Sequence, residues 1–402
     1  MLPNFNCVEL FSGGGGLALG VERAGFHHLA LIEWNRHARD TIALNNGRGV
    51  YRRKWPLLEQ ADVREVDFSA FKGNVALVAG GPPCQPFSMG GVHRGDLDAR
   101  NMFPEAIRAV REIEPQAFLF ENVRGLARQS FRPYIEYILA QLRHPWLRRK
   151  DEEFWQDHAK RLQHVERSRI GGDGPEYWAD CRVISCSNFG APQLRERVIF
   201  IGVRKDLGVE WSWPTPTHSK AALIDEQYVT GEYWKRHHKQ RPPVPESVRT
   251  ALAKTPFIYG LDPLEPWRTV RDQIATVGAP AKVKNRVSTE HNQHVLIPGA
   301  RVYAGHSGSS LDWPAKALKA GVHGVPGGEN MVVLDDGSVR YFTVREAASL
   351  QGFPADYLFS GIWGECMRQI GNAVPVMVAA HFASAIRKIL VSAQSQTRMV
   401  AG

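Results

Sequence analysis

The sequence predicts an α/β protein with a doubly wound, mostly parallel sheet and a second, smaller domain of irregular structure. In the first half of the chain, short apolar runs alternate with helical patterns, and several of these runs end in glycine, proline or acidic motifs. Strands that alternate with helices favour a parallel sheet covered on both faces. From about residue 206 the chain changes to Pro-rich and basic-aromatic segments, which predict the second domain.

Each expected strand is a short, mostly apolar run, and each expected helix repeats its apolar residues every three or four positions. The expected strands cover residues 7–11, 28–32, 74–79, 117–120, 182–186 and 197–203, and the expected helices cover residues 17–24, 103–112, 343–351 and 374–389. The last two strands should form a hairpin. The charged segment 144–176 ends in a glycine cluster and is expected to be a helical insertion. We expect one domain from residues 1–205 and 340–402, and another from residues 206–339.

Composition narrows the class of protein. The chain has 402 residues, of which 43% are hydrophobic and 23% charged, so it is not largely disordered and can bury a core without disulfides. Its 50 basic and 41 acidic residues give a net charge of +9, which favours a polyanionic partner, although basic enzymes are common.

Cysteine usage and hydropathy indicate the compartment. The five cysteines lack CxxC spacing, which predicts a reducing cytosol, no disulfide framework and no metal site. No apolar run reaches the roughly 18 residues that a membrane span requires, and the first residues do not resemble a signal peptide.

A glycine loop follows the first expected strand. In FSGGGG, Gly13, Gly15 and Ala18 fit the dinucleotide fingerprint G-x-G-x-x-A. Glu33 lies 20 residues after Gly13, at the end of the next expected strand, where a carboxylate can accept both hydroxyls of a ribose. NAD, FAD and S-adenosylmethionine share an adenosine, so the loop predicts an adenosine site without separating them. A tight turn without a ligand is the structural alternative.

Cys84 lies in GGPPCQPFS, directly after the third expected strand. The prolines before it restrict the backbone, and the glycine-rich stretch after it can move. A rigidly held thiol beside a mobile loop is typical of a nucleophile that is covered during the reaction. The alternative is a buried structural cysteine.

Two further motifs carry charged side chains. Glu121 ends the fourth expected strand within ENV, and the segment QLRER places Arg195 and Arg197 on one face if it is extended. Separately these are ordinary capping and surface groups. Together with a thiol near an adenosine site they could grip a heterocycle, with arginine on a carbonyl oxygen and a protonated glutamate on a ring nitrogen.

PPCQPFS, ENV, QLRER and GNAVP, in this order, closely resemble the motifs of the DNA (cytosine-5) methyltransferases. The resemblance covers almost the whole chain and is poor at about 206–335 and in the insertion. It implies a Rossmann-like methyltransferase domain, S-adenosylmethionine as cofactor, double-stranded DNA as partner, and methylation of carbon 5 of a flipped-out cytosine through a covalent Cys84 adduct. The chain resembles the stand-alone bacterial enzymes, often paired with a restriction endonuclease, which implies a cytoplasmic, nucleoid-associated monomer.

The resemblance also assigns roles to residues. Cys84 would be the nucleophile, Glu121 would hold a proton at N3 of the base, and Arg195, with Arg197, would neutralise its O2 edge. The implied cofactor contacts are Phe11, Gly13, Gly14, Gly15, Gly16, Glu33, Trp34, Asp62, Val63, Pro83, Met102, Asn372 and Ala373.

DNA contacts are expected in two places. Gln85, Ser88 and Arg94 lie in the loop after the nucleophile, which could fill the hole left by the flipped base. In the second domain, side chains able to meet phosphates or base edges are Arg236, Lys239, Arg241 and Arg286, the last beginning RVSTEHNQH, with further base-reading candidates in AGHSGSS from residue 304. A solvated basic loop is the alternative for residues 236–241.

Three other functions fit parts of the sequence. A transfer-RNA cytosine-5 methyltransferase would share the catalytic motifs, but the 142 residues between Arg197 and Arg340 favour DNA. A non-catalytic DNA-binding regulator would not need Cys84, Glu121 and Arg195. A nicotinamide-dependent dehydrogenase would leave PPCQPFS, QLRER and GNAVP unexplained.

Overall fold

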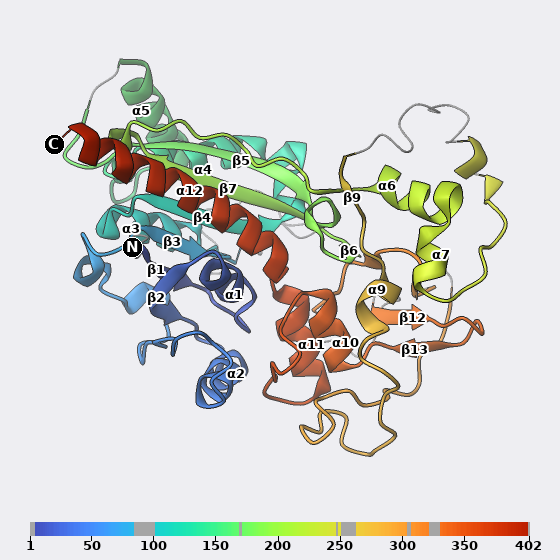
Figure 1. Cartoon of the computed structure of the whole chain (residues 1–402). Helices are drawn as coiled ribbons and strands as arrows, with labels where there is room; N and C mark the ends of the chain where they lie inside the picture. Colours follow the sequence, from blue (N-terminus) through green and yellow to red (C-terminus); the bar gives the residue numbers. More distant parts are fainter. Residues whose placement is uncertain are drawn as a thin grey trace. The chain divides into compact units, whose positions relative to one another are not determined.

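The computed structural model describes residues 5–83, 101–168, 171–246, 248–250, 263–303, 307–320 and 330–400. The chain forms two compact units (Figure 1). The first unit is Met1–Ile184, Glu196–Trp213 and Ala379–Gly402, and the second is Ser185–Arg195 and Pro214–Val378. These boundaries differ from the expected domains at residues 185–195 and 340–378, which join the second unit. They do so because helix α10 (Val344–Leu350) packs on its neighbours there and Gln193 hydrogen-bonds to Leu350 and Gln351.

A six-stranded sheet in the order β2-β1-β3-β4-β7-β5 forms the first unit (Figure 1). Its strands are β1 Phe5–Leu10, β2 Phe26–Ile32, β3 Leu77–Gly80, β4 Ala117–Val123, β5 Tyr177–Ser185 and β7 Glu196–Arg204. The pairs β1–β2, β1–β3 and β3–β4 are parallel, whereas β4–β7 is antiparallel. The predicted α/β fold with a mostly parallel sheet is therefore confirmed, and every expected strand overlaps one of these six.

Helices and turns accompany this sheet. The helices are α1 Gly16–Arg23, α2 Arg36–Gly47, α3 Phe103–Ile113, α4 Arg132–Arg143, α5 Trp155–Ser168 and α12 Val376–Val400, and short 3-10 turns cover Val63–Glu65, Phe68–Phe71, Arg124–Ala127, Gln129–Phe131 and Lys205–Leu207. Among the described residues of the expected insertion, Trp155–Ser168 alone is α-helical. The hydroxyl of Tyr137 on α4 lies 2.8 Å from Nδ1 of His158 on α5, and this contact links the two helices.

The core of the first unit lies between the sheet and these helices. β4 is buried along AFLFEN, as a strand covered on both faces should be. Phe118 and Phe120 are fully buried, and burial of each such side chain contributes about 1.5–3 kcal/mol. Gly202 on β7 makes the close β4–β7 contact possible, because a Cβ there would lie 2.1 Å from Cζ of Phe118. α3 buries Phe103, Ala106, Ile107, Val110 and Ile113 at helical spacing.

Helix α12 is longer than the expected helix 374–389. The segment Trp363–Gln396 is long and apolar enough to cross a membrane by length and composition, and half of its most apolar window is buried. On α12, Phe382, Ile386 and Leu390 are buried at helical spacing. This pattern is that of a core helix, which passes the same test as a membrane span.

Short elements make up the second unit, as its composition predicted. The helical segments are Cys186–Phe189, α6 Lys220–Ile224, the π-helical turn Asp225–Thr230, α7 Glu232–Arg236, α9 Val270–Ile274, α10 and α11 Trp363–Asn372. The strands are β6 Gln193–Leu194, β8 His218–Ser219, β9 Glu265–Pro266, β10 Ser309–Ser310, β11 Ala315–Lys316, β12 Met331–Val333 and β13 Val339–Tyr341. Capping boxes at Thr269 and Thr343 fix the starts of α9 and α10.

A buried polar cluster lies beneath the start of α1. Burial lowers the pKa of His28 to about 4, so its ring is neutral at pH 7. His28 Nε2 donates to the carbonyl of Ala18 at 3.1 Å, which leaves Nδ1 to accept from the Cys7 thiol at 3.1 Å. Glu9, two residues after Cys7 on β1, is fully buried, and burial raises its pKa well above 4.5.

The Glu9→Gln variant should therefore become more stable relative to wild type as pH rises from about 5 to 7. Because the pKa of Glu9 is raised in the folded state, its contribution to stability is present below 4.5 and is lost as pH rises. The neutral, isosteric glutamine avoids this loss, which is about 1.4 kcal/mol per pH unit between the two pKa values. Urea unfolding of both proteins across this range measures the difference, and a constant difference would contradict the assignment.

Candidate active site

Four sequence motifs meet at one edge of the sheet in the first unit. Parallel strands end at the same edge, and ligands of open α/β sheets bind there. The glycine loop follows β1, Glu33 follows β2, the Gly81–Pro82–Pro83 segment follows β3, and Glu121 lies near the end of β4. The structure thus brings the glycine loop, Glu33, Pro83 and Glu121 to one edge of the sheet.

Glu33 closes the glycine loop. Its Oε2 accepts a hydrogen bond from Gly13 N at 2.7 Å, and its Oε1 accepts one from Asn35 N at 2.7 Å. Gly13 and Gly15 have φ values of 53° and 85°, and Phe11 has the left-handed value of 56° as well. A carboxylate has about four lone-pair positions, so Glu33 can still accept bonds from a ribose. The sequence did not show that the loop itself would hold this carboxylate.

The other expected cofactor residues have different surroundings. Trp34 is 73% exposed, so its indole face is open to a planar ligand. Asp62 caps the turn at Val63 and pairs with Arg64 at 2.5 Å, and this bond lowers the pKa of Asp62. Val63 is buried in the core, so its side chain faces away from solvent. Phe11 and Met102 pack against the same apolar core cluster.

The backbone just before Cys84 is held firmly. Asn122 Nδ2 donates to the carbonyl of Pro82 at 2.8 Å, and Met102 N donates to the carbonyl of Pro83 at 3.0 Å. Pro83 and Met102 are therefore neighbours in space. Cys84, Gln85, Ser88 and Arg94 lie outside the described residues. No role was predicted for Asn122 from the sequence. Its position next to Glu121, at the end of a strand, was the feature from which a role at the site could have been predicted.

Glu121 forms an ion pair with Arg197. Arg197 Nε lies 2.5 Å from Glu121 Oε1, and both side chains are nearly buried. β4 and β7 are antiparallel, and Val123 lies opposite Arg197, which brings the two charged side chains together. A Cβ at Gly81 would lie 3.5 Å from Glu121 Oε2, so a glycine here lets the backbone that follows β3 pass close to the carboxylate. The pair therefore borders the path to Cys84.

Arg195 lies in a different environment from Arg197. It is 1% exposed, and its guanidinium donates to the carbonyls of Leu318 at 3.0 Å, Gly371 at 2.7 Å and Ala373 at 3.1 Å. All these groups belong to the second unit, where Asn372 and Ala373 follow directly at the end of α11. In this geometry the guanidinium of Arg195, which was expected to neutralise a base, binds backbone carbonyls of the second unit. The chain is not one continuous strand here, because β6 ends at Leu194 and β7 begins at Glu196.

Comparison with known proteins decides the family. Residues 5–144 and 172–388 match the model of the C-5 cytosine-specific DNA methylases. The chain belongs to this family. The methylase is 30% identical to the Type II methyltransferase M.NgoMIV of Neisseria gonorrhoeae over 389 residues, which cover 96% of this chain and 98% of that protein. It is 29% identical to M.Eco47II of Escherichia coli over 377 residues, 92% and 76% of the two chains.

A solved structure supports the fold of the methylase. The S. pombe Dnmt2 methyltransferase aligns with a TM-score of 0.55 and 18% identity, covering 96% of this chain and 99% of that one. The family match leaves residues 145–171 uncovered. This gap agrees with the expected insertion at 144–176, which lies outside the shared pattern.

The two arginines of the methylase should respond differently to substitution. Arg195→Met leaves three buried carbonyls without their charged donor, and we expect a loss of about 3 kcal/mol or more in the free energy of unfolding. Arg197→Met, the matched control, should cost less stability and lose methyl transfer, because Arg197 borders the path to Cys84. Urea unfolding with a methyl-transfer assay separates these effects. The reverse pattern, with Arg197→Met the more destabilised protein, would contradict the geometry.

Three expected DNA contacts are engaged within the second unit. Arg236 pairs with Glu226 at 2.5 Å and with Asp272 at 3.2 Å. Lys239 pairs with Asp335 at 2.7 Å, and Arg241 donates to the carbonyl of Tyr228. Asp272 and Asp335 lie in distant segments and Glu226 lies 10 residues before Arg236, so none of these acidic partners falls within the basic run 235–241 itself. These three side chains therefore have partners within the second unit, whereas Arg286 is exposed.

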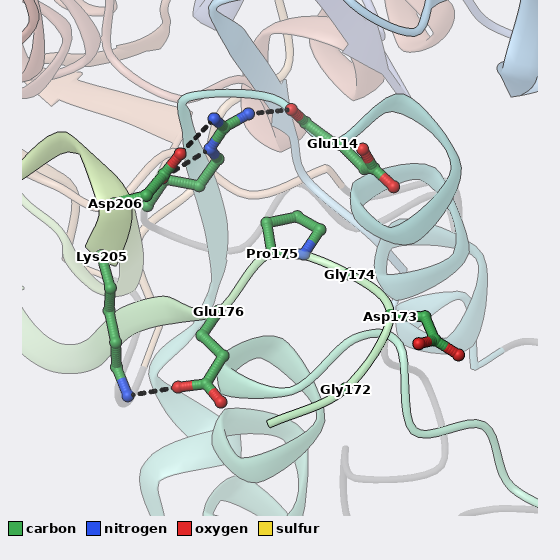
Figure 2. A pocket seen from close by; sticks show the side chains of 9 residues that line it. Glu114, Gly172, Asp173, Gly174, Pro175, Glu176, Lys205 and Asp206 are labelled. Atoms are coloured by element: carbon green, nitrogen blue, oxygen red, sulfur yellow. Dashed lines mark hydrogen bonds and ion pairs between the residues drawn. The ribbon is translucent and has the colours of Figure 1, made fainter. Parts of the chain in front are cut away.

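A hollow of about 700 Å³ lies at the opposite edge of the sheet, before β4 and after β7 (Figure 2). In this hollow, Arg204 pairs with Asp206 and donates to the carbonyl of Glu114, and Lys205 pairs with Glu176 at 2.8 Å (Figure 2). These pairs engage Arg204, Lys205, Asp206 and Glu176, and Asp173 is drawn at the hollow without a dashed line (Figure 2). Among the described residues, no group of three or more His, Cys, Asp or Glu side chains could hold a metal ion.

Proposed function

We propose that this methylase transfers the methyl group of S-adenosylmethionine to carbon 5 of a flipped-out cytosine in a specific double-stranded DNA sequence. The observation that carries the proposal is the Glu121–Arg197 pair, which borders the fixed backbone before Cys84 at the sheet edge that also holds Glu33. With the thiol of Cys84, which follows Pro83 in the chain, the carboxylate and the guanidinium of this pair would serve one flipped base beside an adenosine site.

The residues after β1 and β2 fit an adenosine-containing cofactor. A Cβ at Gly13 would meet no atom within 4 Å, so the loop presents bare backbone toward open space. Glu33 can accept from ribose hydroxyls, and the exposed Trp34 indole can stack on a purine. When bound, S-adenosylmethionine supplies an electrophilic methyl group. Phe11, Met102 and the amides of the glycine loop would complete the pocket in the first unit.

The protein must make carbon 5 of cytosine nucleophilic. Addition of the Cys84 thiolate to carbon 6 places electron density on carbon 5, as in an enamine. Glu121 would hold a proton at N3 while this density builds. Arg197, rather than Arg195, would neutralise the O2 edge, because only Arg197 pairs with Glu121 and lies next to the β3 exit. A final base, for which a bound water is the candidate, removes hydrogen 5 and releases Cys84.

The reacting atoms of cytosine are not reachable in a stacked duplex, so the base must leave the helix at a cost of a few kcal/mol. We assign closure over the base, and contact with the emptied position, to the segment that holds Gln85, Ser88 and Arg94. We assign target recognition to the second unit. The relatives named above are Type II methyltransferases. By analogy we propose a bacterial, cytoplasmic, monomeric enzyme whose cognate restriction endonuclease is encoded nearby.

The Glu33→Ala variant should bind S-adenosylmethionine at least about 10-fold more weakly, because it loses both the ribose acceptor and the bond that closes the glycine loop. Binding of the target duplex should change little. Calorimetric titration of each ligand measures the two affinities. Glu59→Ala, an exposed acidic position outside the loop, is the control and should leave both unchanged. Unchanged cofactor affinity in Glu33→Ala would remove Glu33 from the pocket.

The experiment that tests the whole proposal is methylation sequencing of a host that lacks its own cytosine-5 methylation. Expression of wild type should produce 5-methylcytosine at one short DNA sequence, and expression of Cys84→Ser should not. Methylation confined to transfer RNA would favour the alternative substrate class. Absence of methylated cytosine in both nucleic acids, with folded protein present, would overturn the proposal.

A further inference from the structure

A second basic surface in the second unit has unpaired charges. Lys282, Lys284 and Arg286 alternate along the chain and are all exposed. None of the three forms an ion pair with any residue that the structure describes, in contrast to Arg236 and Lys239. The segment is irregular, with a bend at Lys284 and a turn that begins at Arg286. Three exposed positive charges nevertheless lie within five consecutive residues, so they form one compact basic surface that the phosphates of a DNA strand can approach.

Residues 281–296, here called the anchored loop, hold this surface in a fixed shape. At its base, Ala281 N donates to the carbonyl of His294 at 2.9 Å, and Leu296 N donates to the carbonyl of Ala281 at 2.9 Å. These bonds form a parallel bridge between residues 281 and 295. The base of the loop is therefore closed by backbone bonds that do not use its basic side chains.

Two buried side chains next to the base fasten the loop to the rest of the second unit. Gln293 Nε2 donates to the carbonyl of Phe359 at 2.7 Å, and Gln293 Oε1 accepts from Phe359 N at 2.9 Å. His294 Nδ1 lies 2.9 Å from the Thr343 hydroxyl at the start of α10. Figure 1 shows this part of the chain beside α10 and α11. The loop is thus attached to the helical part of the unit at several points.

The backbone of the loop is strained where it is fastened. Asn292 and Gln293 are consecutive non-glycine residues with φ values of 49° and 57°. Such left-handed residues are unfavourable by about 1–2 kcal/mol each and persist where surrounding bonds hold them. Asn292 Nδ2 donates to the carbonyl of Ala355 at 2.7 Å, which adds to the Gln293 bonds. A loop held in this way loses little conformational entropy when a ligand binds.

We infer that the anchored loop is the phosphate-contacting surface of the second unit, with Lys282, Lys284 and Arg286 on the DNA backbone, and that the basic run 235–241 is part of the scaffold. The inference rests on the proposed function, since it names the residues through which the enzyme holds its DNA. The exposed polar tip Thr289, Glu290 and His291 would then lie near base edges, where such side chains can form hydrogen bonds.

The test compares two triple variants that lose the same charge. Lys282→Ala/Lys284→Ala/Arg286→Ala removes the proposed contacts, and Lys72→Ala/Arg132→Ala/Lys160→Ala removes three exposed basic residues of the first unit. DNA affinity is measured by fluorescence anisotropy at several salt concentrations. Each lost phosphate contact lowers the slope of log affinity against log salt by about 0.9. We expect the first variant to lose a slope of about 2–3 and at least about 10-fold in affinity, and the second to stay close to wild type.

Two further measurements separate the possible outcomes. Lys282→Arg/Lys284→Arg/Arg286→Lys keeps the charges and should retain the wild-type slope, and S-adenosylmethionine affinity should be unchanged in all variants. If wild type methylates DNA while both alanine variants show the wild-type slope, or lose slope equally, the inference is overturned and the proposed function stands. If wild type neither binds nor methylates DNA, both are overturned.

Discussion

Replacing Cys84 with serine abolishes methyl transfer while cofactor and DNA binding persist. A serine hydroxyl is almost entirely protonated at pH 7 and is a far weaker nucleophile than a thiolate, so carbon 6 of the base is not attacked. The backbone before this position is held by Asn122 and Met102, and the substitution does not touch those bonds. Radiolabelled methyl transfer to duplex DNA is the measurement, and transfer above about 1% of wild type would remove Cys84 from its role.

Cys181→Ser is the matched control for this prediction. Cys181 lies on β5 in the same unit, and burial raises its pKa to about 12, so it is a poor nucleophile at neutral pH. Its serine variant should keep wild-type activity. Calorimetry with S-adenosylmethionine and with the duplex shows whether the inactive Cys84→Ser protein still binds both.

Replacing Glu121 with glutamine should lower the rate of methyl transfer by about 10²–10³-fold, with little change in the affinity for DNA. Glutamine has the size of glutamate but cannot hold an exchangeable proton at N3 as the ring accumulates charge. It also loses the charge that orients Arg197, whose Nε lies 2.5 Å from Glu121 Oε1. Because both effects act in the transition state, the rate constant falls while the dissociation constant for the duplex does not.

Single-turnover kinetics with excess enzyme isolates this step from product release. Arg197→Lys should lie between wild type and Glu121→Gln, because lysine keeps the charge but not the planar, two-donor geometry of arginine. Wild-type single-turnover rates in Glu121→Gln would show that this carboxylate does not take part in the reaction.

Most of the first unit could be predicted because its strands are short apolar runs bounded by glycine, proline or acidic residues. The same runs placed the glycine loop, Glu33, Pro83 and Glu121 at one sheet edge, since the ends of parallel strands coincide. Side-chain partners far apart in the chain could not be predicted in this way. Two such contacts are the hydrogen bond from Gly13 N to the Glu33 carboxylate and the bond from the Asn122 amide to the carbonyl of Pro82.

The partners that the local sequence did not reveal lie far away in the chain. Arg195 and Arg197 would share one face if QLRER were extended, but the chain breaks at Arg195, whose guanidinium donates to the carbonyls of Gly371 and Ala373, 176 and 178 residues away. The basic run 235–241 was interpreted without Asp335, which neutralises Lys239 from another segment. The local sequence predicts on which side of an element a side chain lies only where the backbone is regular. It gives no information about countercharges from distant segments.

A duplex that carries 5-fluorocytosine at the methylated position tests covalent catalysis by Cys84 on a flipped cytosine. The Cys84 thiolate adds at carbon 6 and the methyl group arrives at carbon 5, but fluorine cannot leave as a cation, so the adduct persists. With S-adenosylmethionine present, peptide mapping by mass spectrometry should find the DNA attached to Cys84, and no adduct should form in Cys84→Ser. The account is contradicted if no adduct forms with active wild-type enzyme, or if the DNA is attached to Cys181 or Cys186.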